Sequence, residues 1–134
     1  MPPMPADYRI DRESRRVVSL VRGVYSYDVA VERMRRLQKD PVFESTFSLL
    51  IDFREATKID LSHGEIVELS NIPVFSPESK RAYLVASPEQ FGIARMFASY
   101  KSPTNKNVFQ VFTDIEEAVA WLDSDSTSTP PAGP

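Results

Sequence analysis

The side chains best suited to chemistry lie in one short stretch, between Asp52 and His63. His63 is the only histidine of the chain, and a histidine with its ordinary pKa near 6.5 can act as a general base. Asp60 lies close to His63 in the sequence, but no nucleophile that His63 could activate lies nearby. We therefore favour an exposed polar residue over a catalytic base at position 63.

Metal and cofactor chemistry have little support in the composition. Asp52 and Asp60 could pair to bind a metal or to act as an acid and a base. The chain has one histidine and no cysteines, however, so it lacks the histidine and cysteine cluster that binds a transition metal. We expect Asp52 to begin a turn and Asp60 to bond the nearby backbone. The four glycines form no phosphate-binding loop. We expect no catalytic residue, no metal and no cofactor.

Length and charge narrow the class of protein. With 134 residues the chain fits one domain, and its net charge of −3 argues against nucleic acid as a partner. No apolar run approaches the roughly 20 residues of a transmembrane helix, the N-terminus does not resemble a signal peptide, and the lack of cysteines fits a cytoplasmic protein. We expect residues 1–6 and 123–134 to be disordered and residues 7–122 to form a single domain.

Strands and helices are expected to alternate along this domain. Two β-prone runs, at residues 8–10 and 17–22, suggest a hairpin whose second strand ends at Gly23. Further strands are expected at residues 47–53, 81–86 and 108–113, and helices at 27–39, from 63 to Pro73, at 88–100 and at 115–122. Three of the helices begin with capping-box patterns, Ser62 with Glu65, Ser87 with Gln90 and Asp114 with Glu117.

This order predicts an α/β fold. Alternating strands and helices pair in parallel through right-handed crossovers, which gives a mostly parallel sheet of about five strands, with the N-terminal antiparallel hairpin at its edge and the four helices largely on one face. The strand at 47–53 alternates between apolar and mixed positions. The second face of the sheet is therefore expected to be open or lightly covered, and available to a partner chain.

Two segments resemble the signature of STAS domains, the sulphate-transporter and anti-sigma-factor-antagonist family. They are Asp52-Phe53-Arg54 and Ile59-Asp60-Leu61-Ser62-His63-Gly64, although Leu61 replaces the family's first serine and His63 is an additional residue. Residues 81–86, 92–97 and 111–122 look like small bacterial SpoIIAA-like proteins, which are grouped with STAS and CRAL-TRIO folds. The resemblance implies a SpoIIAA-like β-α superhelix and a non-enzymatic role.

The resemblance also implies a site at Ser62. In STAS antagonists the serine at this helix start is phosphorylated by a partner kinase, and a helix N-terminus suits a phosphate because its amides and dipole face the added charge. The simpler alternative is an unmodified helix cap, worth about 1 kcal/mol, and it carries more weight.

Two further groups of residues have a functional and a structural interpretation. A basic group on the first helix can form an anionic docking patch or, as we favour, a solvated face: Arg33, Arg35, Arg36 and Lys39. An apolar stripe can line a lipid pocket, by analogy with CRAL-TRIO proteins, or belong to the core, as we favour at helical spacing: Phe91, Ala94, Phe97 and Ala98.

We interpret the chain as a STAS-like binding and regulatory module that mediates a protein–protein interaction with a kinase or regulator, switched at Ser62, or with a second copy as a homodimer. Partners are expected at the carboxyl ends of the parallel strands, where the rim residues are Arg54, Glu55, Asp60, His63, Ser87 and Thr113. The alternative is a small-molecule or lipid-binding protein that uses a cleft beneath the third helix. An unrecognised hydrolase comes third.

Overall fold

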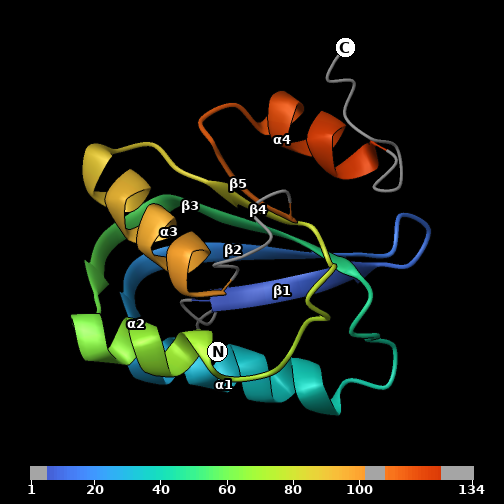
Figure 1. Cartoon of the computed structure of the whole chain (residues 1–134), viewed down its shortest axis with the longest axis horizontal. Helices are drawn as coiled ribbons and strands as arrows, with labels where there is room; N and C mark the ends of the chain where they lie inside the picture. Colours follow the sequence, from blue (N-terminus) through green and yellow to red (C-terminus); the bar gives the residue numbers. More distant parts are fainter. Residues whose placement is uncertain (1–5, 102–107, 125–134) are drawn as a thin grey trace.

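A five-stranded sheet forms the centre of the computed structural model, which describes residues 6–101 and 108–124. Its strands lie in chain order: β1 (Ala6–Asp11), β2 (Arg16–Ser26), β3 (Ser48–Asp60), β4 (Arg81–Leu84) and β5 (Phe109–Phe112) (Figure 1). β1 pairs antiparallel with β2, and the other pairs are parallel. The predicted mostly parallel sheet with an N-terminal antiparallel edge hairpin is therefore confirmed.

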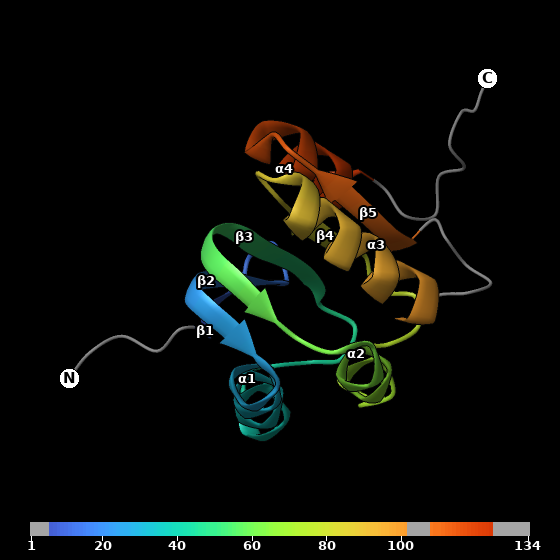
Figure 2. The ribbon, with the colours of Figure 1, turned by 90° about the vertical axis from the view of Figure 1, so that its left-hand side faces the viewer.

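Four helices cover the sheet unequally. α1 (Tyr27–Lys39), α2 (His63–Ser70) and α3 (Pro88–Lys101) lie on one face, and α4 (Ile115–Asp123) lies on the other (Figure 2). The prediction that the helices lie largely on one face is confirmed, with α4 as the exception. Since α4 packs on β3, β4 and β5, it leaves the β1–β2 end of its face uncovered, as expected for a lightly covered face.

Two hydrophobic cores follow from this arrangement. The larger core lies between the sheet and the first three helices and contains Tyr25, Phe53 and Tyr83, whose rings contact one another at centroid distances of 5.2 and 5.6 Å. The smaller core lies under α4, where Leu50 and Leu84 of the sheet meet Leu122. Alternate residues of β3 and β4 thus enter opposite cores, as the pleat of a strand requires.

The helix starts carry the predicted caps, with differences in detail. Ser62 makes a complete capping box with Glu65, with hydrogen bonds of 3.0 and 3.1 Å. Ser87 accepts from the Gln90 amide, but the Gln90 side chain accepts from Ala86. At α4 the side chain of Asp114 accepts from Glu116. These local bonds satisfy amides that a helix leaves unpaired at its start.

Two of the expected strand ends are wrong. β2 continues through Gly23, which adopts a φ of +66° at an irregularity in the pairing, and ends at Ser26. Glycine tolerates this conformation because it lacks a Cβ atom. β3 continues past Asp52 to Asp60 alongside β2. Asp52 therefore lies inside a strand and starts no turn, and a two-stranded ribbon extends beyond the ends of β4 and β5.

Polar contacts join the end of α4 to the starts of β2 and β4. The first strand begins at Ala6 and the last helix ends at Asp123, whose carboxylate forms an ion pair with the largely buried Arg16. Lys80 donates to the main chain of Trp121 and Ser124, and this bond ties the end of α4 to the start of β4. Most of the segments expected to be disordered, residues 1–5 and 125–134, lie outside the described residues.

Candidate functional site

The start of α2 presents Ser62 and His63 at the surface. Both are exposed, and the Ser62 hydroxyl is engaged in the capping box. His63 Nε2 lies 2.8 Å from the hydroxyl of Tyr100 on α3, and the two rings meet edge to face at 5.5 Å. Among the described residues, the polar partner of the imidazole is this phenol of the neighbouring helix, and the contact joins the start of α2 to the end of α3.

The predicted rim residues are distributed over a long distance. Arg54 and Glu55 lie on the extension of β3, where Arg54 binds Asp52 through two hydrogen bonds of 3.1 and 3.0 Å and Glu55 pairs with Arg22 at 3.3 Å. The bond to Asp52 raises the pKa of Arg54 further above its ordinary value.

The other rim residues mark different points of the same side. Ser87 caps α3, and Thr113 is exposed just after β5. Asp60 ends the β3 extension, about 20 Å along the strand from Arg54 at 3.3 Å per residue, and His63 follows three residues later at the start of α2. The structure therefore brings Arg54 and Glu55 together but separates them from Asp60 and His63.

The basic group on α1 does not form one surface. Arg33 is buried and donates to the Ser19 hydroxyl at 3.4 Å, so the expectation that it belongs to a solvated face is wrong. Arg36 pairs with Asp7, and Arg35 lies 4.0 Å from Glu32. These three arginines therefore interact largely with other residues of the protein.

Within residues 6–101 and 108–124, no group of three or more acidic, histidine or cysteine side chains is placed to hold a metal ion. In the same part of the chain, no helix has the length and apolar character needed to cross a membrane.

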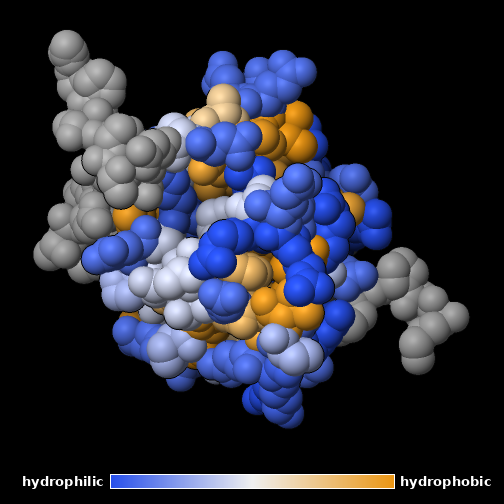
Figure 3. Space-filling view, turned by 90° about the vertical axis from the view of Figure 1, so that its right-hand side faces the viewer, coloured by the Kyte–Doolittle hydropathy of each residue, from blue (hydrophilic) through white to orange (hydrophobic). Residues whose placement is uncertain are grey.

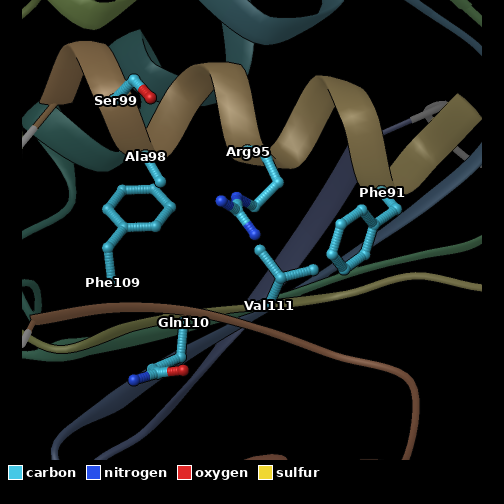
Figure 4. Close-up of a pocket in the computed structure, with 7 residues that line it drawn as sticks. All are labelled: Phe91, Arg95, Ala98, Ser99, Phe109, Gln110 and Val111. Atoms are coloured by element: carbon cyan, nitrogen blue, oxygen red, sulfur yellow. The ribbon is translucent and has the colours of Figure 1, made fainter. Parts of the chain in front are cut away.

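A groove of about 250 Å³ runs between α3 and β5 (Figure 4). We call it the α3–β5 groove. Phe91, Arg95, Ala98 and Ser99 line it from the helix, and Phe109, Gln110 and Val111 line it from the strand. Figure 4 shows the side chains of Phe109 and Val111 extending toward α3, while Gln110 extends away from it.

The apolar stripe of α3 is divided by this groove. Phe91, 41% exposed, and Ala98 line the groove, whereas Ala94 and Phe97 are buried in the larger core. Arg95 is exposed, and its guanidinium lies 5.7 Å from the centre of the Phe91 ring. No ion pair among the described residues includes Arg95, so its charge is available to a ligand.

The outer edge of β5 is open along the groove. The carbonyl of Phe112 accepts from the amide of Val85, the residue just after β4, so the backbone groups of Phe112 and, two residues earlier, Gln110 point toward β4. The backbone groups of Phe109 and Val111 then point to the outer edge, because successive residues of a strand alternate. No described strand pairs with that edge.

A second groove, of about 320 Å³, lies on the face that α4 leaves uncovered. Val18, Leu20 and Leu50 form its apolar part, and Ile115 of α4 borders it. The charged residues around it are largely paired, Arg22 with Glu55 and Asp52 with Arg54. Arg9 also lines this open-face groove, and no ion pair among the described residues includes it.

The side of the molecule near the β1–β2 turn is mainly hydrophilic (Figure 3). Hydrophobic residues appear on it in separate areas with polar side chains between them. Such scattered exposure is ordinary for a monomeric surface and does not mark a docking site.

Sequence reasoning missed Arg95, Ser99, Phe109, Gln110 and Val111 as groove residues. The stripe of residues 91, 94, 97 and 98 was a partial signal, since two of its members line the groove. The strand side carried no signal, because a sequence does not state which strand of a sheet lacks a neighbour.

Comparison with known proteins identifies a solved structure of similar fold. No protein-family model and no curated protein matches the sequence. One similar solved structure is that of an uncharacterized protein of the DUF3478 family with a SpoIIAA-like fold, from Shewanella loihica. The two chains share 19% identity over 91% of this chain and 97% of the other, with a TM-score of 0.60.

The strand order, the three helices on one face and this similarity define the class: the chain has a SpoIIAA-like α/β fold, the fold that its STAS-like segments indicate.

Proposed function

We propose that the protein is a non-enzymatic, STAS-like binding and regulatory module that mediates a protein–protein interaction. The observation that carries this proposal is the α3–β5 groove, which runs beside a strand edge with two outward-facing backbone positions. A partner's extended segment can add to such an edge as a further strand. Main-chain hydrogen bonds then supply affinity, and the adjoining groove supplies selectivity.

The groove suits a partner segment that carries a carboxylate and small aliphatic side chains. Arg95 has no ion pair among the described residues, and a guanidinium binds a carboxylate through two parallel hydrogen bonds. Phe91, Ala98 and Val111 offer apolar contact on either side. Because alternate side chains of a strand face the same way, an acidic residue and an aliphatic residue two positions apart would both face α3.

A second copy of the chain is a poorer occupant. In a two-fold pairing of β5 with β5, the same patch of both copies meets at the axis. Arg95 of each copy would then approach the other, and like charges disfavour that contact. We therefore favour a different protein over a homodimer.

The alternative function, small-molecule or lipid binding, uses the same groove, since Phe91 and Ala98 line it. Its volume of about 250 Å³ lies below the roughly 300–1,000 Å³ of ligand pockets, and such pockets bury most of their ligand. Native mass spectrometry of the purified protein separates the two functions. A lipid that remains bound supports the alternative, whereas an empty protein that binds peptides supports the module.

The binding mode is tested with random peptides displayed on phage. Wild-type protein is the target, and Val111→Pro is the counter-target, because proline removes the outward amide of residue 111 without removing a bond to β4. We expect enriched peptides to carry acidic and aliphatic residues two positions apart and to lose at least tenfold in affinity for Val111→Pro. Enrichment of peptides that bind both proteins equally would contradict the proposed edge.

Matched variants test the contacts of the groove. Phe91→Ser and Val42→Ser each remove one exposed hydrophobic side chain, of 41% and 36% exposure, but only Phe91 lines the groove. Arg95→Glu and Arg35→Glu each reverse one exposed charge on a helix. We expect only the Phe91 and Arg95 variants to weaken the enriched peptides.

We propose Ser62 as the regulatory site, as the STAS resemblance implies. A phosphate on Ser62 would lie beside the exposed imidazole of His63, which now contacts Tyr100. Tyr100 follows Ser99, which lines the α3–β5 groove. A phosphate that attracts His63 would weaken the contact between α2 and α3, and the change would reach one end of the groove.

Phosphate incorporation tests this site directly. Wild type, Ser62→Ala and Ser87→Ala are incubated with cell extract and labelled ATP. We expect the label to be lost only in the Ser62 variant, and equal incorporation in all three proteins would end the proposal.

A further inference from the structure

Two buried guanidinium groups are not explained by the binding function. Arg33 of α1 is 5% exposed and Arg81 of β4 is 4% exposed. Neither takes part in an ion pair among the described residues. Moving a charged side chain out of water without a counter-charge is costly, and a group in that position is normally paired.

The hydrogen bonds of these arginines are few. Arg33 donates to the Ser19 hydroxyl at 3.4 Å, and its guanidinium lies 5.7 Å from the Tyr25 ring centre. Arg81 donates to the carbonyls of Ser79 and Pro77 at 3.2 and 3.4 Å. Each guanidinium has five N–H donors, and these bonds use only some of them. No fully buried side-chain nitrogen or oxygen among the described residues lacks a hydrogen bond, so the nitrogens with spare donors are accessible to water or to another acceptor.

Both arginines line one small cavity. It measures about 30 Å³ and lies between α1, β3, β4 and the connection that follows α2. Tyr83 also lines the cavity, and its hydroxyl has no hydrogen bond among the described residues. The remaining lining residues are apolar: Met34, Leu37, Leu49, Val74 and Phe75. No carboxylate lines the cavity.

We propose that this cavity binds a monoatomic anion of chloride size. Two cationic groups and a phenol line it, all three can donate, and no acid competes for them. The cavity volume of about 30 Å³ exceeds the roughly 10–15 Å³ that one water molecule needs in the same measure, so a chloride fits.

The electrostatics of the surrounding groups agree with an anion. Burial lowers the pKa of Arg81, and burial raises the pKa of Tyr83, while both arginines act in the opposite direction on Tyr83. Tyr83 therefore stays a neutral donor at ordinary pH and cannot serve as the counter-charge itself. None of the residues that line the cavity supplies a negative charge to balance the two arginines, which favours an anion from solution.

The proposal is tested by thermal unfolding in sodium chloride and in sodium gluconate at equal ionic strength. Gluconate is too large for the cavity. A ligand that binds only the folded state raises Tm with its concentration. We expect the wild-type Tm to rise with chloride and to stay lower in gluconate.

Arg33→Met is the matched variant, with Arg35→Met as the control on the exposed face of α1. We expect Arg33→Met to lose the difference between the salts and, in gluconate, to unfold at the wild-type temperature or above, because an unpaired buried charge has been removed. A variant that is less stable in gluconate and keeps the full difference between the salts would overturn the proposal.

A second measurement does not depend on a variant. Crystals of the wild-type protein grown in sodium bromide are measured at the bromine absorption edge. We expect an anomalous peak between the Arg33 and Arg81 guanidinium groups. The proposal is wrong if bromide is absent from the cavity in these crystals.

Discussion

The capping box at Ser62 allows a quantitative prediction for the residue on which the proposed switch depends. The Ser62 hydroxyl accepts from the Glu65 amide at 3.1 Å, and the Glu65 carboxylate accepts from the Ser62 amide at 3.0 Å. Ser62→Ala removes only the first bond, because the second uses the main chain. The Glu65 amide that loses its partner lies at an exposed helix start, where water can replace the hydroxyl.

The expected cost is therefore that of an ordinary cap, about 1 kcal/mol of the free energy of unfolding. For a domain of this size the same loss lowers Tm by about 4 °C. Ser62→Asn keeps a side-chain acceptor at the cap and should change stability by no more than a few tenths of a kcal/mol. Urea unfolding followed by far-ultraviolet circular dichroism measures both variants.

The two variants also separate the effect of the cap on stability from the effect of phosphorylation on regulation. Neither variant can be phosphorylated on residue 62, but only Ser62→Ala loses the cap. An Ala variant as stable as the wild type, or one destabilised by more than about 3 kcal/mol, would refute the assignment of Ser62 as an exposed cap. The Asn variant is then the correct negative control in the kinase experiment, because it keeps the fold of α2.

Three further predictions concern the fold. Burial and the hydrogen bond to Asp40 raise the pKa of Tyr8 to about 12, and burial raises the pKa of Tyr83. Because the folded state holds both tyrosines neutral, their contribution to stability should be complete below pH 10 and should fall as the pH rises above it. Spectrophotometric titration at 295 nm should show Tyr8 and Tyr83 ionising only well above pH 10. Gly23→Ala should cost about 1 kcal/mol because residue 23 has a φ of +66°, whereas Gly64→Ala in the first turn of α2 should be neutral or stabilising in the same urea assay; equal effects would contradict the positive φ at Gly23. Leu122→Ala should cost about 2–3 kcal/mol because Leu122 of α4 is buried in the smaller core, and Ile115→Ala, at a side chain 40% exposed, should cost less than about 1 kcal/mol; the reverse order in thermal unfolding would contradict the packing of α4 on the sheet.

Local signals in the sequence accounted for most of the fold. Caps at Ser62, Ser87 and Asp114, together with the apolar periodicity, located the helices, because capping and amphipathicity act within a few residues. The ribbon formed by the ends of β2 and β3 was missed. Gly23 looked like a strand end, but a glycine at an irregular pairing position continues the strand, and only the partner strand shows which case applies.

The functional surfaces were harder to predict because they depend on neighbours. Arg33 lies on the same helical stripe as Ala30, Met34 and Leu37, so the helical spacing indicates its burial although a charged side chain usually favours a solvated face. The α3–β5 groove depends on β5 being the last strand of the sheet, and strand order arises from packing of the whole chain. No local pattern around Val111 carries that information.

Amide hydrogen exchange along β5 tests the central claim most directly. A peptide enriched on the wild-type protein is added to saturation, and exchange is followed residue by residue by nuclear magnetic resonance. If the peptide adds as a strand, the outward amides of Phe109 and Val111 will become protected, while those of Gln110 and Phe112, already bonded to β4, will be protected with and without peptide. Unchanged exchange at Val111 in the saturated complex, or new protection confined to the open-face groove, would contradict the claim that the partner binds at β5.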